Sequence, residues 1–230
     1  MLAEFSETLN RLDFEMCNMA KLYFLGGEDL AKRDSEQINK KAFADAGGAP
    51  IVLVFIGWTS KSVNKTETYR RIIVDYFKEI GAEKIVFAEL SDSLETIDKK
   101  MENADLIYLP GGDPKLLVER IKKKGLDALL RRYDKVILGN SAGALALCRD
   151  CLMVGDETHE ETTMISGVGV VDFCVDVHYS SSKDKQLIEL SKGKRIYAIA
   201  ERSALVSDER GISFFGIVYM FYRGKKTQCF

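Results

Sequence analysis

Residues 136–147 read VILGNSAGALAL, and this stretch decides how the rest of the chain is interpreted. An apolar run typical of a buried strand ends at Gly139, and a stretch with helical spacing begins after Ser141. Gly139, Ser141 and Gly143 match the pattern G-x-S-x-G, in which small neighbours let the chain turn sharply and expose a serine hydroxyl. The stretch predicts strand, turn and helix, with Ser141 as candidate nucleophile rather than a structural turn serine. The N–H of Ala142 would then be a donor for an oxyanion.

The same run of apolar residues followed by a turn occurs at several other places in the chain. The runs are KLYFLGG (21–27), IVLVFIG (51–57), KIVFAEL (84–90), LIYLPGG (106–112) and KVILGN (135–140). Segments with helical spacing separate them, at 35–46, 65–80, 91–103 and 114–133, the last with a break at Gly125. Strands that alternate with helices predict an α/β fold in three layers, with a mostly parallel central sheet covered on both faces.

Beyond Ser141 the pattern changes to β-rich runs that follow one another closely. These runs are MISGVGVV (164–171), RIYAIAE (195–201), SALVSD (203–208) and ISFFGIVYMF (212–221). Short turns between them predict an antiparallel C-terminal extension of the sheet. Because no linker composition interrupts the chain, we expect a single α/β domain over residues 21–230. Residues 1–20 are expected to form a helical or disordered extension.

Composition restricts the classes of protein that the chain can belong to. The net charge is -2, with 46% hydrophobic and 30% charged residues, which is typical of a soluble globular protein and does not favour nucleic acid or membrane partners. No apolar run is long enough to span a bilayer. The first twenty residues lack the pattern of a signal peptide, so we expect a cytoplasmic location. No metal or organic cofactor is expected.

The five cysteines favour reduced thiols over a disulfide framework. Cys148 and Cys151 form a C-x-x-C pair that could be redox-active or contribute to a zinc site. The other cysteines lack the spacing of a second ligand pair, which favours a structural role.

A serine nucleophile needs a base, and the chain offers two histidines. His178 ends an apolar run and is preferred, whereas His159 lies in an acidic stretch typical of a solvated loop. The carboxylate that would orient the histidine is either Asp156 or Glu201, and the pattern alone leaves both open.

Four blocks of sequence together resemble a known family. They are LPGGDPKLL (109–117), GNSAGA (139–144), DVHY (176–179) and IYAIAERSAL (196–205). They resemble the serine peptidases that include aspartyl dipeptidase and cyanophycinase, whose fold is similar to class I glutamine amidotransferase-like domains. The resemblance covers residues 21–208.

The resemblance implies a role for several residues. It implies Ser141 as nucleophile and His178 as base, and it favours Glu201 over Asp156 as the acid. It implies that the glycine pair Gly111 and Gly112 lies at the oxyanion site, with Gly112 as the donor that acts with Ala142.

The resemblance also raises questions about the substrate. Asp113 stands where family members often carry Asn or Gln, and a carboxylate there would repel an acidic substrate group. An amino-terminal aspartate would need a cation, for which Arg202 and Lys183 are candidates, although the favoured interpretation of each is a solvated surface charge. Trp58, in the polar segment 57–71, either lines the site or packs in the core.

The sequence therefore predicts a serine exopeptidase, similar to a dipeptidase, that hydrolyses short peptides, including those with an amino-terminal aspartyl residue. One alternative is a hydrolase of β-aspartyl bonds, as in cyanophycinase. Another is an inactive binding or regulatory module on the same fold. The expected partner is a small peptide, and the family resemblance implies a homodimer.

Overall fold

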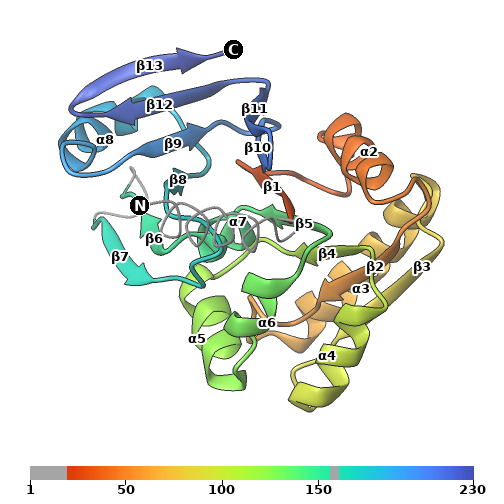
Figure 1. Ribbon diagram of the computed structural model, residues 1–230. Coiled ribbons are helices and arrows are strands. Elements are labelled where there is room, and N and C mark those ends of the chain that lie inside the picture. Colours follow the sequence, from red (N-terminus) through yellow and green to blue (C-terminus); the bar gives the residue numbers. More distant parts are fainter. Residues whose placement is uncertain (1–19, 156–160) are drawn as a thin grey trace, which may run out of the picture.

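The computed structural model describes residues 20–155 and 161–230, and in these residues a seven-stranded sheet forms the centre of the molecule (Figure 1). Its strands lie in the order β11-β10-β1-β5-β4-β2-β3. The parallel strands are β1 (Lys21–Leu25), β5 (Val136–Asn140), β4 (Leu106–Leu109), β2 (Ile51–Phe55) and β3 (Lys84–Ala88). β10 (Ala204–Asp208) pairs antiparallel with β1, and β11 (Gly211–Phe215) pairs antiparallel with β10.

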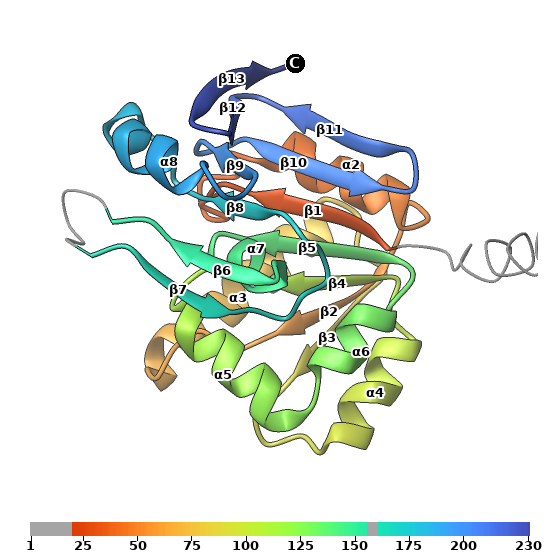
Figure 2. The same ribbon diagram turned by 60° about the vertical axis from the view of Figure 1, so that its left-hand side comes forward.

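Helices cover both faces of this sheet because successive strand residues point to opposite sides. Tyr23 and Leu25 pack with α2 (Glu36–Asp45) and α3 (Val63–Glu79). Leu22 and Phe24 pack into the core on the other face. The helices of that second face are α4 (Leu94–Glu102), α5 (Pro114–Lys124), α6 (Asp127–Arg132) and α7 (Ala142–Leu147). Figure 2 shows the resulting three layers, as the sequence predicted.

Four strands within residues 174–229 form a second sheet next to the first. Its order is β13-β12-β9-β8, from β13 (Lys225–Cys229), β12 (Val218–Tyr222), β9 (Ile196–Ile199) and β8 (Cys174–Asp176). The pairs β13–β12 and β12–β9 are antiparallel, and β8 runs parallel to β9. A 3₁₀ turn (Ser181–Lys183) and α8 (Asp184–Leu190) connect β8 to β9, and β6 (Asp150–Met153) pairs with β7 (Thr163–Ser166) as a hairpin.

The predicted elements agree closely with the observed ones. Each of the five predicted runs contains a parallel strand, and Gly125, with a φ of +77°, ends α5 at the predicted break. α3 begins at Val63, before the predicted start, because Ser62 accepts a hydrogen bond from the N–H of Lys65 and caps the helix. The extension predicted for residues 1–20 lies outside the described residues, apart from Ala20.

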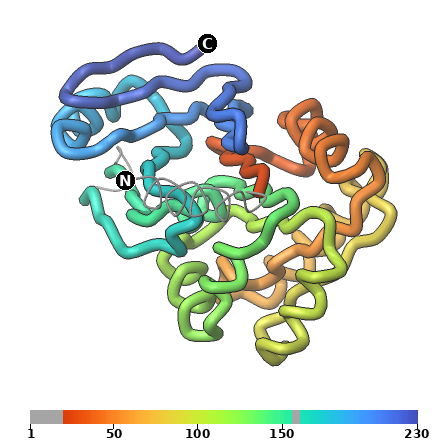
Figure 3. Tube along the Cα trace, viewed as in Figure 1, coloured from red at the N-terminus to blue at the C-terminus, as the bar shows by residue number. Residues whose placement is uncertain are grey.

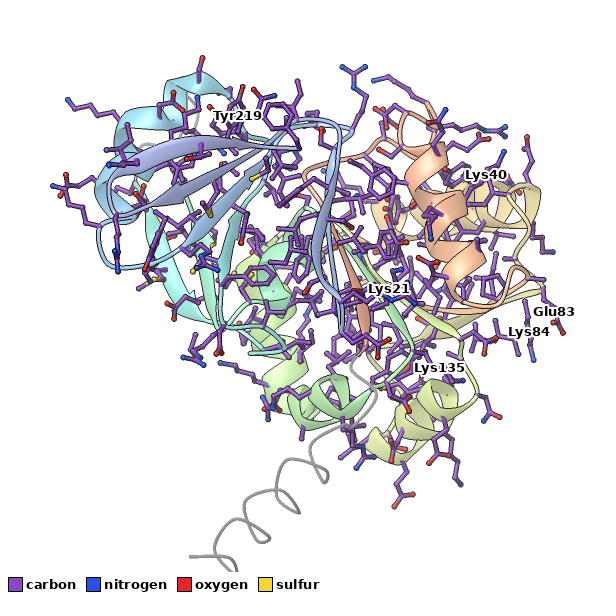
Figure 4. The ribbon with its side chains drawn as sticks, turned by 45° about the horizontal axis from the view of Figure 1, so that its top comes forward. Lys21, Lys40, Glu83, Lys84, Lys135 and Tyr219 are labelled. Atoms are coloured by element: carbon purple, nitrogen blue, oxygen red, sulfur yellow. The ribbon has the colours of Figure 1, made fainter. Side chains whose placement is uncertain are left out.

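The two ends of the parallel strands define the two edges of the sheet. Lys21 and Lys135, labelled in Figure 4, lie at the amino-terminal edge, where Lys21 N–H donates to the carbonyl of Lys135. The tube in Figure 3 shows the red β1 segment beside the green β5 and the blue β10. At the other edge the strands continue into the predicted site residues. Within residues 20–155 and 161–230, no helix has the length and apolarity needed to cross a bilayer.

Candidate active site

Ser141 lies on a sharp turn between β5 and α7. Its φ of +50° and ψ of -106° are far from the values of either element, as expected for a serine presented on a strand–turn–helix elbow. The flanking glycines are required by space. A Cβ on Gly143 would lie 2.1 Å from the carbonyl oxygen of Leu109, and one on Gly139 would lie 2.7 Å from the backbone of Ala144. The turn can therefore pass tightly over the end of β4.

The structure brings Ser141, His178 and Glu201 together at the ends of different strands. The Oγ of Ser141 lies 2.6 Å from Nε2 of His178. Nδ1 of His178 is hydrogen-bonded to Oε1 of Glu201. The histidine and glutamate side chains are each about half exposed, so a ligand can approach them from solvent. This linear arrangement is the geometry in which a base and an orienting acid serve a serine hydroxyl.

The end of β1 positions the backbone of all three segments. Three consecutive carbonyl groups accept hydrogen bonds from N–H groups there: Leu25 from Ser141 (3.0 Å), Gly26 from His178 (2.7 Å) and Gly27 from Arg202 (2.9 Å). A Cβ on Gly27 would lie 2.2 Å from Oε2 of Glu201 and 2.6 Å from Nδ1 of His178. Position 27 must therefore be glycine for these two side chains to meet. The sequence pattern predicts only that this glycine follows a strand.

The predicted oxyanion residues also lie next to the serine. A Cβ on Gly111 would be 3.5 Å from Cβ of Ser141, so this backbone passes close to the hydroxyl. Gly112 has a φ of +130°, and a Cβ there would be 2.8 Å from the side chain of Thr59. Ala142 is the first residue of α7, so its N–H has no acceptor within its own helix.

Asp113 has a structural task that accounts for its presence. It is the N-cap of α5, and its Oδ1 accepts a hydrogen bond of 3.1 Å from the N–H of Leu116. The side chain is exposed at the rim of the site. The carboxylate can therefore attract or repel charged groups of a substrate while it caps the helix.

Two cavities meet at the serine. One, of about 740 Å³, lies toward α5 and the β6–β7 hairpin. The other, of about 590 Å³, lies toward the end of β1 and the start of α3. Ser141 and His178 line both. A substrate that spans the two cavities would cross the serine hydroxyl.

The two candidate cations have different environments. Lys183 lines the larger cavity but is only 5% exposed. Its Nζ lies 3.0 Å from Oδ1 of Asp176 and donates to the carbonyl of Val177. The expectation that Lys183 is a solvated surface charge is therefore wrong, because the ion pair holds it inside. Arg202 is exposed next to Glu201.

The remaining predicted residues lie either away from the site or outside the residues that the structure describes. Trp58 is fully buried and packs on Phe55, and its Nε1 donates a hydrogen bond to the carbonyl of Ala88. Trp58 therefore packs in the core and does not line the site. Cys148 and Cys151 are buried free thiols, and burial raises the pKa of Cys151 to about 12, as expected of structural cysteines. The alternative acid Asp156 and the alternative base His159 lie outside the described residues.

Sequence reasoning missed one acidic residue in the smaller cavity. Glu28 follows the end of β1 and lines the same cavity as Ser141. Its Oε1 accepts from the hydroxyl of Tyr108 (2.8 Å), and its Oε2 accepts from Nδ2 of Asn39 (2.7 Å). Burial raises the pKa of this carboxyl to about 7. The available signal was its position after a strand of the parallel sheet, where ligand-binding loops gather.

Comparison with known proteins shows the family to which the chain belongs. The model of peptidase family S51 matches residues 22–214. The uncharacterized peptidase Lin0382 of Listeria innocua is 24% identical over 168 residues, and the match covers 67% of this chain and 80% of that protein. The uncharacterized peptidase Lmo0363 of Listeria monocytogenes is 24% identical over 191 residues, covering 72% of this chain and 93% of that protein.

Two solved structures share the fold. A crystal structure of a peptidase from an acI-B1 actinobacterium has a TM-score of 0.69 at 19% identity, covering 94% of this chain and 96% of its own. A crystal structure of a candidate peptidase E protein from Listeria monocytogenes has a TM-score of 0.63 at 20% identity, covering 86% of this chain and 98% of its own.

The fold and the family match together define the class of protein. It is an enzyme, a serine-type peptidase built on an α/β sheet. The chain belongs to peptidase family S51, whose model spans most of its length.

Proposed function

We propose that the protein is a serine exopeptidase of the dipeptidase type, which hydrolyses short peptides through Ser141, His178 and Glu201. The observation that carries the proposal is the hydrogen-bonded chain from Ser141 Oγ through His178 to Glu201, placed where two cavities meet. The family match supplies the class of reaction.

The chemistry proceeds through an acyl-enzyme. Ser141 Oγ attacks the scissile carbonyl while Nε2 of His178 takes its proton. The C–N bond then breaks, and His178 returns the proton to the leaving amine. Water attacks the resulting ester, again with His178 as base, and the acid product and free Ser141 are released.

Glu201 acts through His178. Its carboxylate accepts the Nδ1–H, which leaves Nε2 free to accept the serine proton. The same carboxylate stabilises the imidazolium cation that forms during attack. This role needs a hydrogen bond and a negative charge.

The negative charge on the carbonyl oxygen is stabilised by backbone N–H groups. We assign this role to Gly112 and Ala142, which line the larger cavity together with Ser141 and follow the ends of β4 and β5. Donors fixed in the fold need no rearrangement during the reaction, which is why such sites lower the barrier. Gly111 leaves the space next to Ser141 that the substrate carbonyl requires.

The cavities fit a short peptide, and their charges argue against a strict need for an acidic residue. The charged residues that line the larger cavity are Asp113, Glu161, the exposed Lys115, and the ion pair of Asp176 with Lys183. Because Lys183 is already paired, an aspartyl side chain would have to compete with Asp176 for it. An amino-terminal aspartate is therefore one substrate among several to test.

The proposal is tested by hydrolysis of Asp-Leu, β-Asp-Leu, β-Asp-Arg and Ala-Leu by the purified protein and by Ser141→Ala. We expect cleavage of at least one α-linked dipeptide, which falls at least about 10⁴-fold in the variant. Cleavage of the β-linked peptides alone would instead establish the β-aspartyl hydrolase. Absence of cleavage by folded protein would contradict the exopeptidase and favour the binding module.

A further inference from the structure

The smaller cavity contains a carboxyl group that the proposed catalytic chemistry does not use. Glu28 lines this cavity together with Ser141 and His178. A Cβ on the preceding residue, Gly27, would clash with both His178 and Glu201, so the backbone passes directly beside these side chains. The carboxyl group is thus built into the same strand end that positions the reactive side chains.

Glu28 is held in place by side chains from two elements, and side chains of a third element contact those in turn. Tyr108 of β4 and Asn39 of α2 each donate one hydrogen bond to it. Tyr69 of α3 is hydrogen-bonded to Tyr108 and lines the same cavity. Tyr76, also of α3, accepts from Nδ2 of Asn39. These contacts fix the orientation of the carboxyl group.

The carboxyl group retains the capacity to bind a donor. Each carboxylate oxygen can accept about two hydrogen bonds, and each oxygen of Glu28 accepts one from its neighbours. Desolvation disfavours its charged form, and the charge of Asp34 adds to that effect. An incoming cation would offset both costs, because a desolvated carboxylate gains most from a positively charged partner.

We propose that Glu28 binds the free α-ammonium group of the substrate, so that the smaller cavity accepts the unblocked amino-terminal segment of a short peptide. The inference rests on the proposed function and names its substrate class, peptides with a free amino end. The size of the cavity, about 590 Å³, suits a short segment.

A positively charged side chain also lines this cavity. Lys65 of α3 lines it, which raises the opposite possibility that the cavity accepts a substrate carboxylate. Glu28 is the better anchor because its position is fixed by two hydrogen bonds and its carboxyl is largely desolvated. Lys65 carries its charge on a long flexible stem, which costs entropy to order.

The test compares free and N-acetylated forms of Ala-Leu and Asp-Leu with wild-type protein and Glu28→Gln. The substitution keeps the size of the side chain, and the amide of Asn39 can flip so that its Oδ1 accepts from the new amide group. We expect the wild type to prefer the free-amine peptides by at least about 10-fold in kcat/KM. Glu28→Gln should remove that preference by raising KM for the free-amine peptides alone.

A matched control separates binding from support of the fold. Glu79→Gln, at an exposed glutamate of α3 that pairs with Arg33, removes a negative charge outside the cavity, so the preference for a free amine should persist. Equal loss on free and acetylated peptides in Glu28→Gln would show a structural role only and overturn the inference. So would equal cleavage of both forms by the wild type, which leaves the proposed function standing. Cleavage of neither form would overturn the proposed function and the inference with it.

Discussion

Three residues of the site have left-handed backbone conformations, which residues other than glycine rarely adopt. Ser141, His178 and Arg202 have φ values of +50°, +51° and +58°. Such conformations cost on the order of 1 kcal/mol or more each and persist where surrounding contacts fix them. Here the fixing contacts are the hydrogen bonds to the end of β1. Strain at the site thus accompanies the exposure of the serine hydroxyl.

This strain predicts a difference between two inactive variants. Ser141→Gly should be more stable than Ser141→Ala by about 1 kcal/mol, because glycine adopts a positive φ without steric cost. Both variants should lack peptidase activity. Chemical denaturation of the two variants in parallel checks the prediction, and equal midpoints would show that residue 141 is not strained.

A second prediction concerns the orienting acid. Glu201→Gln should lower kcat about 10³- to 10⁴-fold with little change in KM, because the amide can stabilise the wrong tautomer and carries no charge. Steady-state kinetics on the best dipeptide of the panel checks this. Glu189→Gln, at an exposed glutamate of α8 that pairs with Lys192, is the control and should retain wild-type kinetics. A drop of less than about 10-fold at Glu201 would contradict the assignment.

At the scale of elements, the close passage of the elbow over β4 explains why glycine occupies position 143. A methyl group there would lie 2.1 Å from the carbonyl oxygen of Leu109. Gly143→Ala should therefore lower the free energy of unfolding by about 3 kcal/mol or more and displace Ser141. Gly193→Ala is the control, since a methyl group there meets open space. Thermal unfolding that is equal for the two variants would contradict the packing described for the elbow.

The parallel strands could be predicted because strands buried on both faces are continuous apolar runs. β6 and α8 were missed, since they span only four and seven residues and give no clear periodicity. The turn at Ser141 and the choice of His178 followed from local pattern. Glu201 required the family resemblance, because triad order differs among folds.

Glu28 and Lys183 show what a local pattern cannot reveal. The partners of Glu28, Asn39 and Tyr108, lie on separate elements, and the fold alone brings them together. Lys183 was interpreted as a surface charge because lysine is rarely buried. Its ion pair with Asp176 forms only where the 3₁₀ turn lies against β8.

For the whole molecule, Glu28 predicts how stability depends on pH. Its pKa is raised from the ordinary 4.5 to about 7 in the folded state, so between these values the folded protein retains a proton that the unfolded chain has lost. The contribution of Glu28 to stability therefore falls as the pH rises through this window, by at most about 3 kcal/mol. Glu28→Gln should gain stability relative to the wild type between pH 5 and pH 8. Melting temperatures at the two pH values check this, and a constant difference would contradict it.

The proposal that Ser141 is a nucleophile activated by His178 is tested most directly by the intact mass of the protein after reaction with a fluorophosphonate. We expect one covalent adduct, located at Ser141 by peptide mapping. We expect no adduct on folded Ser141→Ala and much slower labelling of His178→Ala. An unlabelled wild type that is folded by circular dichroism, or equal labelling of Ser141→Ala, would contradict the claim.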